Sequence, residues 1–306
     1  MPIEPPQHLS EAARAYLLDP PPRTEPFDAC DPAAVQRVRE ETHPEWMAVN
    51  DDITGPWCCR DDTVAGVPVV WFAADEGDFD RSEVIVHLHG GAYIVGSPMT
   101  NAALAVPVAQ RSGVPVVSVD YRLAPEHPCP AAVEDAVAVV AELGAERPLV
   151  AMFGESAGGG LTLATAVGLR DQGATVPERL GLIAPWVDLT CSGDTYRTLL
   201  GADPSFGDPQ QPPQWAAAYA GEATADPQAS PLFADLSGLP PVLIQVGGRE
   251  VLLSDSLRLH QALLRAGVES TLDVWDAMWH VWHSNPTLPE TVHAFDDLAA
   301  FLTPPR

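Results

Sequence analysis

Short runs of apolar and β-branched residues recur along the chain and alternate with longer segments in which apolar residues follow a helical spacing. Such alternation is typical of parallel βαβ units, with each run a buried strand. The pattern therefore predicts an α/β protein, with a mostly parallel wound sheet and helices on both faces. The predicted strands are 69–73, 84–89, 114–120, 149–154, 180–184, 242–246 and 271–274, and the predicted helices are 101–111, 131–143, 157–170, 254–266 and 290–302, with Asn101 and Ser254 as N-caps.

Two regions break this alternation. Residues 10–18 and 32–41 are amphipathic and precede the first strand, while residues 188–237 are Pro-rich and carry no strand pattern. A long excursion of this kind is uncommon in a compact domain unless it forms a functional lid. We therefore expect a helical cap. The predicted organisation is an N-terminal cap segment at 1–50, a core at 51–187, a cap insertion at 188–237 with a helix at 213–220, and the rest of the core at 238–306.

The 306 residues are enough for one large domain with a modest insertion. Apolar segments are of strand length only, and the N-terminal residues lack the basic and apolar pattern of a secretory signal. We therefore expect a soluble, cytoplasmic protein that has no membrane partner.

The net charge of -26 opposes binding to nucleic acid or anionic membranes, because phosphate recognition requires clustered cations. All 16 cations are Arg, and the absence of Lys excludes Schiff-base chemistry and a P-loop. The five cysteines form no CxxC pair, so neither a zinc knuckle nor a disulfide framework is expected.

The pentapeptide Gly154-Glu155-Ser156-Ala157-Gly158 joins the predicted strand 149–154 to the predicted helix 157–170. A Gly-x-Ser-x-Gly sequence in that position is typical of a nucleophile elbow, in which a strained turn exposes the serine hydroxyl. A tight glycine turn that happens to contain serine is the alternative. The context favours Ser156 as a nucleophile.

An activated serine requires a base, a group that orients the base, and donors for the oxyanion. Glu250 follows the predicted strand 242–246, and His280 follows the predicted strand 271–274. The carboxyl ends of parallel strands meet at one edge of the sheet, where ligands bind. Glu250 and His280 can therefore converge on Ser156 at that edge. His89-Gly90-Gly91-Ala92 also follows a strand, and its glycine N–H groups, together with that of Ala157, are candidate oxyanion donors.

Other residues compete for these roles. His283 lies close to His280 in sequence, and Asp255 is an alternative to Glu250, although Asp255 falls inside a predicted helix. His87 and His89 alternate on a strand and suggest zinc, but the further Asp/His cluster or HExxH motif of a metallohydrolase is missing. The sequence therefore favours the serine chemistry, with no metal and no cofactor.

Three separated motifs resemble those of the hormone-sensitive-lipase-like esterases of the α/β-hydrolase fold. They are His89-Gly90-Gly91-Ala92, the segment 120–128 (DYRLAPEHP) continued by Pro130-Ala131-Ala132, and Gly154 to Gly159. The resemblance covers about residues 69–283, and residues 9–17 resemble the first cap helix of that family. It implies Ser156 as nucleophile, His280 as general base and acid, Glu250 as the orienting acid, and Gly90, Gly91 and Ala157 as oxyanion donors.

The chain departs from the family pattern at several positions. Glu250 stands where Asp is usual, Ala92 replaces a third Gly, Glu155 replaces the commoner Asp, and Val281-Trp282 replaces Gly-Phe. Glu can orient the histidine Nδ1 equally well, and Val281 and Trp282 are expected to reshape the pocket. We also expect residues 120–127 to brace the elbow by buried charge pairs. An acyl pocket lined by Tyr93, Trp186, Trp215, Trp279 and Trp282 is one interpretation, and core packing of each is the other.

The resemblance implies a cofactor-free serine carboxylesterase that hydrolyses short-chain acyl esters and forms a homodimer. The same triad serves lactone hydrolases and N-acetyl deacetylases of secondary metabolism, so the substrate is a small-molecule ester, lactone or N-acetyl compound. A non-catalytic small-molecule receptor, as in plant gibberellin receptors, is a further alternative. Those receptors lack the catalytic histidine, whereas His280 is present here.

Overall fold

A computed structural model describes residues 4–22, 25–206 and 208–304, so residues 1–3, 23–24 and 207 of the predicted cap segments lie outside the described residues. One eight-stranded sheet runs through the described chain in the order β1-β2-β4-β3-β5-β6-β7-β8. All seven predicted strands are present, with ends that differ by one to two residues. The strands are β1 (Cys58–Val64), β2 (Val67–Ala73), β3 (Val84–Leu88), β4 (Val116–Val119), β5 (Leu149–Glu155), β6 (Leu180–Ile183), β7 (Val242–Gly247) and β8 (Ser270–Trp275).

The sheet is parallel from β4 to β8, as the alternation of strands and helices predicted. At the other edge, β2 pairs antiparallel with both β1 and β4. β1 was not predicted, because it is an exposed edge strand with five consecutive exposed residues and no apolar alternation. A tight turn joins it to β2, with positive φ at Ala65 (52°) and Gly66 (79°).

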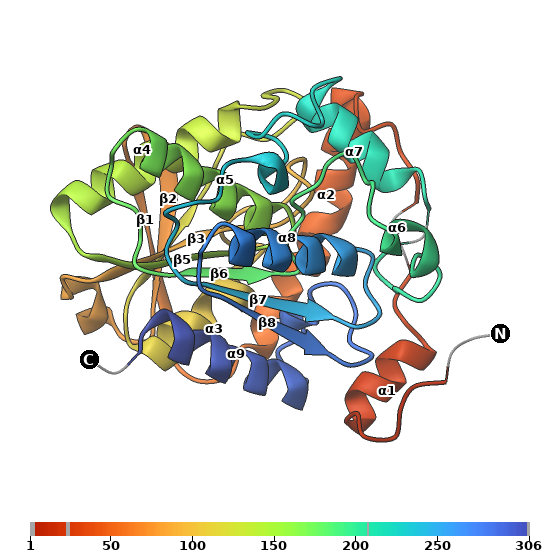
Figure 1. The fold of residues 1–306 in the computed structure, drawn as a ribbon. Helices are drawn as coiled ribbons and strands as arrows, with labels where there is room; N and C mark the ends of the chain where they lie inside the picture. Colours follow the sequence, from red (N-terminus) through yellow and green to blue (C-terminus); the bar gives the residue numbers. More distant parts are fainter. Residues whose placement is uncertain (1–3, 23–24, 207, 305–306) are drawn as a thin grey trace.

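Helices cover both faces of the sheet (Figure 1). α3 and α9 pack against one face, and α4, α5 and α8 pack against the other. None of the described helices is long and apolar enough to cross a membrane. The helices are α1 (Glu11–Leu18), α2 (Pro32–Ala48), α3 (Ala102–Ser112), α4 (Ala131–Glu146), α5 (Ala157–Asp171), α6 (Thr195–Thr198), α7 (Gln211–Ala220), α8 (Leu253–Arg265) and α9 (Pro289–Leu302), with 3-10 turns at Val49–Asp52, Glu76–Asp80, Pro231–Phe233 and Trp282–Ser284.

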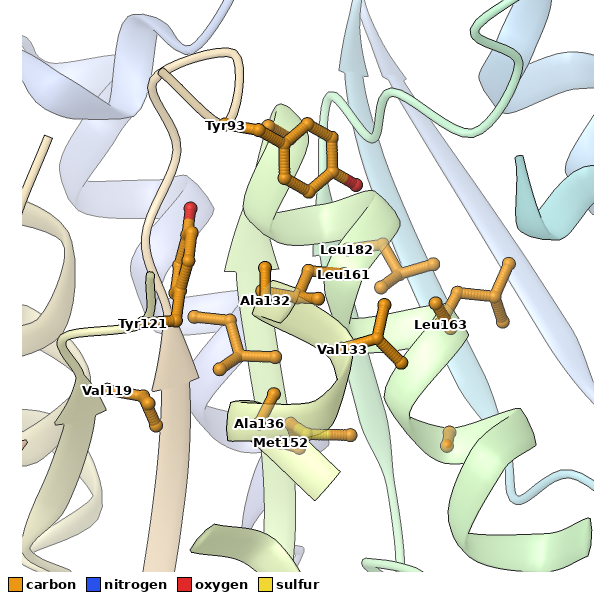
Figure 2. Packing of buried hydrophobic residues seen from close by; sticks show 14 of the residues in the cluster. Tyr93, Val119, Tyr121, Ala132, Val133, Ala136, Met152, Leu161, Leu163 and Leu182 are labelled. Carbon is orange, nitrogen blue, oxygen red and sulfur yellow. The ribbon is translucent and has the colours of Figure 1, made fainter. Parts of the chain in front are cut away.

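The larger part of the core lies between the sheet and the α4–α5 layer. Figure 2 shows this layer, where Ala132, Val133 and Ala136 of α4 lie with Leu161 and Leu163 of α5 and with strand residues such as Met152. Small residues on α4 allow the two helices to pack closely. Full burial of one Leu side chain stabilises the fold by about 1.5–3 kcal/mol, so this layer fixes α5 firmly against β5.

α1, α2, α6 and α7 fall in the two segments that lack a strand pattern, 1–50 and 188–237, and we refer to these two segments as the cap. In Figure 1 the arrowheads of β7 and β8 point toward the side on which α1 and α6 lie. Ser10 caps α1, since its hydroxyl accepts a hydrogen bond from the Ala13 N–H. α2 runs to Ala48, beyond the predicted end at residue 41.

The predicted N-caps need correction. Asn101 holds the N-cap position of α3, but its amide binds Glu155 and does not cap the helix. Ser254 lies inside α8, whose N-cap is Leu252, so that prediction was wrong. The Ser254 hydroxyl instead accepts a hydrogen bond from the Thr195 N–H in the cap, at 3.1 Å. The Ser254 hydroxyl therefore makes a tertiary hydrogen bond to the Thr195 N–H in place of the expected bond to the first turn of its own helix.

Candidate active site

Ser156 lies on the sharp turn between β5 and α5 with φ 55° and ψ −121°. A non-glycine residue with positive φ is strained, and the neighbouring glycines make the turn possible. A Cβ atom on Gly158 would lie 1.9 Å from the Leu88 carbonyl oxygen, and one on Gly154 would lie 2.5 Å from the Gly158 oxygen. Strand and helix can therefore approach this closely only with glycine at both positions.

Three side chains from different elements form a hydrogen-bonded chain at the carboxyl edge of the sheet. His280 Nε2 lies 3.0 Å from Ser156 Oγ, and His280 Nδ1 lies 3.2 Å from Glu250 Oε1. Glu250 Oε2 accepts the Gly247 N–H at 2.8 Å, which fixes the carboxylate on its turn after β7. With its proton on Nδ1, the imidazole satisfies both contacts and presents a lone pair to the serine hydroxyl.

Burial controls the protonation of this chain. It lowers the pKa of His280 to about 4, against the opposing charges of Asp203 and Glu155. Burial also raises the pKa of the Glu250 carboxyl, and the Gly247 N–H acts in the opposite direction. The imidazole is consequently neutral at neutral pH, which is the form that can accept a proton from Ser156.

The loop after β3 carries candidate oxyanion donors, but they differ from those predicted. The Gly90 N–H donates to Glu155 Oε1, so the prediction of Gly90 as a donor is corrected. The N–H groups of Gly91, Ala92 and Ala157 have no acceptor among the described residues. Gly91 and Ala92 have positive φ, at 116° and 55°, and consecutive positive-φ residues turn successive N–H groups toward one side.

Glu155 anchors this loop to the elbow. Its buried carboxylate accepts from Asn101 Nδ2 at 2.8 Å as well as from Gly90, and it contacts His87 Nε2 at 2.9 Å. His87 Nδ1 in turn contacts Ser118 Oγ at 2.9 Å. The residue before Ser156 therefore joins β3, β4, β5 and α3 in one polar network.

The segment 120–127 braces the same loop, although less by charge than predicted. The Tyr121 hydroxyl donates to the His89 carbonyl at 2.6 Å, and the two rings stack at 4.2 Å. The charge pairs Arg122–Asp135 and Arg39–Glu126 are partly exposed, so the prediction of buried pairs was wrong. Arg39 also donates to the Ile94 carbonyl at 2.7 Å, which ties α2 of the cap to the loop.

The competing residues lie elsewhere. His283 is fully buried and contacts Gln245 Oε1 at 3.2 Å, away from Ser156. Asp255 accepts the N–H groups of Val187 and Asp188, at 3.2 and 3.0 Å. His87 and His89 have separate partners, and the described residues hold no group of three His, Cys, Asp or Glu side chains suited to a metal ion.

The predicted pocket residues separate into two groups. Tyr93 is buried and stacks on Tyr219 of α7 at 3.8 Å, with Trp186 at 6.3 Å. The backbone N–H of Trp186 donates to the Ser156 carbonyl at 2.8 Å. Trp215 lies 6.0 Å from Phe206, whose ring is 5.0 Å from that of His280. Trp186 and Phe206 therefore contact the residues of the hydrogen-bonded chain, and Tyr93, Tyr219 and Trp215 pack next to these two.

Trp282 and Trp279 belong to a different cluster. Trp282 is fully buried beside Trp275 and His283, so it has no surface with which to line an open pocket, and its prediction is corrected. Trp279 stacks on Tyr16 of α1 at 4.2 Å. Asp203 and Phe206 were not predicted, because the Pro-rich cap insertion offers no periodic pattern from which to identify them.

Comparison with known proteins gives consistent matches. The family described as alpha/beta hydrolase fold matches residues 85–284 of the chain. The acetyl-hydrolase of Streptomyces hygroscopicus is 42% identical over 223 residues, which cover 71% of this chain and 74% of that protein.

Two solved structures extend the likeness to nearly the whole chain. The esterase EstE5, in a crystal soaked with p-nitrophenyl butyrate, is 38% identical, with a TM-score of 0.82 and 96% of each chain covered. An esterase from the bacterial hormone-sensitive lipase family is 35% identical, also with a TM-score of 0.82, and 95% of each chain is covered.

Proposed function

The chain belongs to the α/β-hydrolase fold family and to its hormone-sensitive-lipase-like esterases, and on that premise we propose that this carboxylic-ester hydrolase cleaves short-chain acyl esters through an acyl-enzyme on Ser156. One observation carries the proposal. The chain of contacts from Ser156 Oγ through His280 to Glu250, at 3.0 and 3.2 Å, is the arrangement that serine activation requires.

In the first half of the reaction, Ser156 Oγ attacks the ester carbonyl while its proton passes to His280 Nε2. Glu250 accepts the Nδ1–H and stabilises the imidazolium that forms. The tetrahedral intermediate then collapses, the bond to the alcohol oxygen breaks, and His280 returns the proton to the departing alcohol. The products of this half are a free alcohol and an acyl ester on Ser156.

In the second half, His280 removes a proton from water, and the resulting hydroxide attacks the acyl carbonyl. Collapse of the second tetrahedral intermediate releases the carboxylic acid and restores the serine hydroxyl with the proton from His280. The same residues act twice, so no further acid or base is required.

We assign the oxyanion to the N–H groups of Gly91, Ala92 and Ala157. This assignment is supported because none of the three N–H groups has an acceptor among the described residues, whereas the Gly90 N–H donates to Glu155. Ala157 is the first residue of α5, and the N–H groups in the first turn of a helix have no partner inside the helix and favour a negative charge beside them. Each such donor contributes about 3 kcal/mol of transition-state stabilisation.

The names of two relatives favour a small acyl group. One is an acetyl-hydrolase and the other is an esterase soaked with a butyrate ester, so acetyl and butyryl esters are the first substrates to test. Because the word acetyl does not specify the bond cleaved, an N-acetyl amide and a lactone remain the second candidates. A non-catalytic receptor is disfavoured by a family of named esterases and by the contact between His280 and Ser156.

A side-by-side assay tests the proposal. We expect p-nitrophenyl acetate and butyrate to be hydrolysed faster than an N-acetyl amide or a medium-ring lactone. Ser156→Ala should abolish turnover of every substrate, while Ser237→Ala, at an exposed serine, should retain it. Turnover by Ser156→Ala well above background would contradict the proposal. The cytoplasmic location and the homodimer stay predictions of the sequence.

A further inference from the structure

Asp203 is a fully buried carboxyl group in the cap, between α6 and α7. Its Oδ1 accepts the Ser205 N–H at 2.9 Å, and its Oδ2 accepts the Val251 N–H at 3.0 Å. Val251 directly follows Glu250. The cap insertion therefore places a carboxylate on the backbone of the turn that carries the acid of the proposed triad.

Other contacts hold this turn from the same side. The Thr195 hydroxyl donates to the Val251 carbonyl at 2.6 Å and accepts the Ser254 N–H at 2.9 Å. Next to Asp203, the Ser205 hydroxyl contacts the His280 carbonyl at 3.4 Å. The loop that contains Asp203 thus contacts the backbone of the base, His280, and of the residue that follows the acid, Val251.

Charge connects Asp203 to the reacting groups as well. Its negative charge raises the pKa of His280 and thereby opposes the lowering that burial causes. Burial raises the pKa of Asp203 to about 6, with His280 lowering it and Glu250 raising it. Among the described residues, the titratable and polar groups that interact with His280 include Ser156, Glu250, Asp203, Glu155 and His283. Those that interact with Asp203 include His280, Glu250 and Tyr16 of α1, besides the N–H groups of Ser205 and Val251.

We propose that Asp203 is a positioning residue for ester hydrolysis, which holds the Glu250 turn from the cap and stabilises the imidazolium that forms on His280 at each proton transfer. The inference rests on the proposed Ser156–His280–Glu250 chemistry. Asp203 is fully buried, and it acts through its hydrogen bond to the Val251 N–H and through its charge.

The test is Asp203→Asn, which keeps the size of the side chain and removes its charge. We expect kcat for p-nitrophenyl acetate to fall about tenfold, a fraction of what general acid–base catalysis contributes, with KM little changed. The wild-type kcat should fall in a step near pH 6, where Asp203 binds a proton and loses its charge, and Asp203→Asn should lack this step because its side chain is neutral at every pH. Asp203→Glu, which retains a titratable carboxyl group, should keep a step of this kind.

Thr195→Val is the matched control, because Thr195 holds the same turn without charge. It should lower the melting temperature and leave the step near pH 6 in place. Unchanged kcat and a retained step near pH 6 in folded Asp203→Asn would overturn the inference, and Ser156→Ala in the same assay shows separately whether the proposed function stands. Asp203→Ser is the second neutral variant, and failure of both to fold would assign Asp203 to stability alone and equally overturn the inference.

Discussion

The carboxylate of Glu155 accepts a hydrogen bond from the backbone N–H of Gly90, across 65 positions of the chain. Glu155 immediately precedes the candidate nucleophile, and Gly90 begins the loop that carries the candidate oxyanion donors. The contact therefore fixes the distance between two parts of the site that different strands supply, β5 and β3. Disturbing it should move the donors relative to Ser156.

Glu155→Ala should destabilise the protein strongly, because it leaves His87, Asn101 and the Gly90 N–H buried without their partner. Loss of one member of such a buried network costs about 3–5 kcal/mol. Glu155→Gln is the matched variant, since its amide can satisfy the same partners once His87 changes tautomer, and it should cost much less. Urea denaturation of both variants measures the difference, and equal losses would contradict the role given to this network.

Gly158→Ala should distort the elbow. The added Cβ would lie 1.9 Å from the Leu88 carbonyl oxygen, a backbone atom that cannot rotate away. We expect a loss of about 3 kcal/mol in the free energy of unfolding and a large fall in kcat. Gly201→Ala is the control, because nothing lies within 4 Å of its added Cβ. An active, stable Gly158→Ala would show that strand and helix are less closely packed here than described.

The pH dependence of ester hydrolysis should reveal the lowered pKa of the buried His280 imidazole. Because burial lowers the pKa of His280 to about 4, the neutral base persists far below the ordinary histidine value of 6.5. In Asp203→Asn, whose side chain does not titrate, we expect kcat/KM for a short-chain ester to stay level from about pH 8 to pH 5 and to fall only as pH drops through about 4. An acid limb centred near pH 6.5 would contradict this burial.

Asp255 should make stability fall as pH rises. Burial, and then the charge of Asp188, raises the pKa of Asp255 from 3.8 to about 8. Between pH 3.8 and about 8, the native state retains a proton on Asp255 that the unfolded chain releases. The free energy of unfolding therefore falls by up to about 1.4 kcal/mol for each pH unit, and it stops falling above about pH 8. Asp255→Asn removes this dependence.

The comparison is best made between pH 7 and 8, where the buried histidines are neutral in the folded state and mostly neutral in the unfolded state. Asp255→Asn should also fold well, because Asp255 Oδ1 has no partner in the described structure and an amide nitrogen can occupy its place. Parallel slopes of unfolding free energy against pH in the two proteins would contradict a protonated Asp255.

Much of the fold was predictable because buried parallel strands are apolar throughout and read clearly in the sequence. β5 is an example, since all seven of its residues are buried. β1 was missed because it is an exposed edge strand, on which burial imposes no pattern. The N-cap at Ser254 failed for another reason, since Thr195 of the distant cap determines where that hydroxyl binds.

In the candidate site, too, some residues could be predicted from the sequence and others could not. Ser156 and His280 could be predicted because each follows a recognisable strand, and the structure brings them within 3.0 Å of each other. Gly90 was assigned as a donor because the sequence does not reveal that Glu155 occupies its N–H. Asp203 gave no signal, since its proximity to Glu250 depends on how the cap folds back over the sheet.

In the proposed reaction, Ser156 carries the acyl group during turnover. Intact-mass spectrometry of protein quenched in acid during hydrolysis of an acetyl and a butyryl ester, followed by peptide mapping, detects that group. We expect an adduct of one acyl group per chain, on the peptide that contains Ser156, absent from Ser156→Ala and accumulating in His280→Ala only far more slowly. An acyl group on any other residue, or hydrolysis by Ser156→Ala at the wild-type rate, would contradict it.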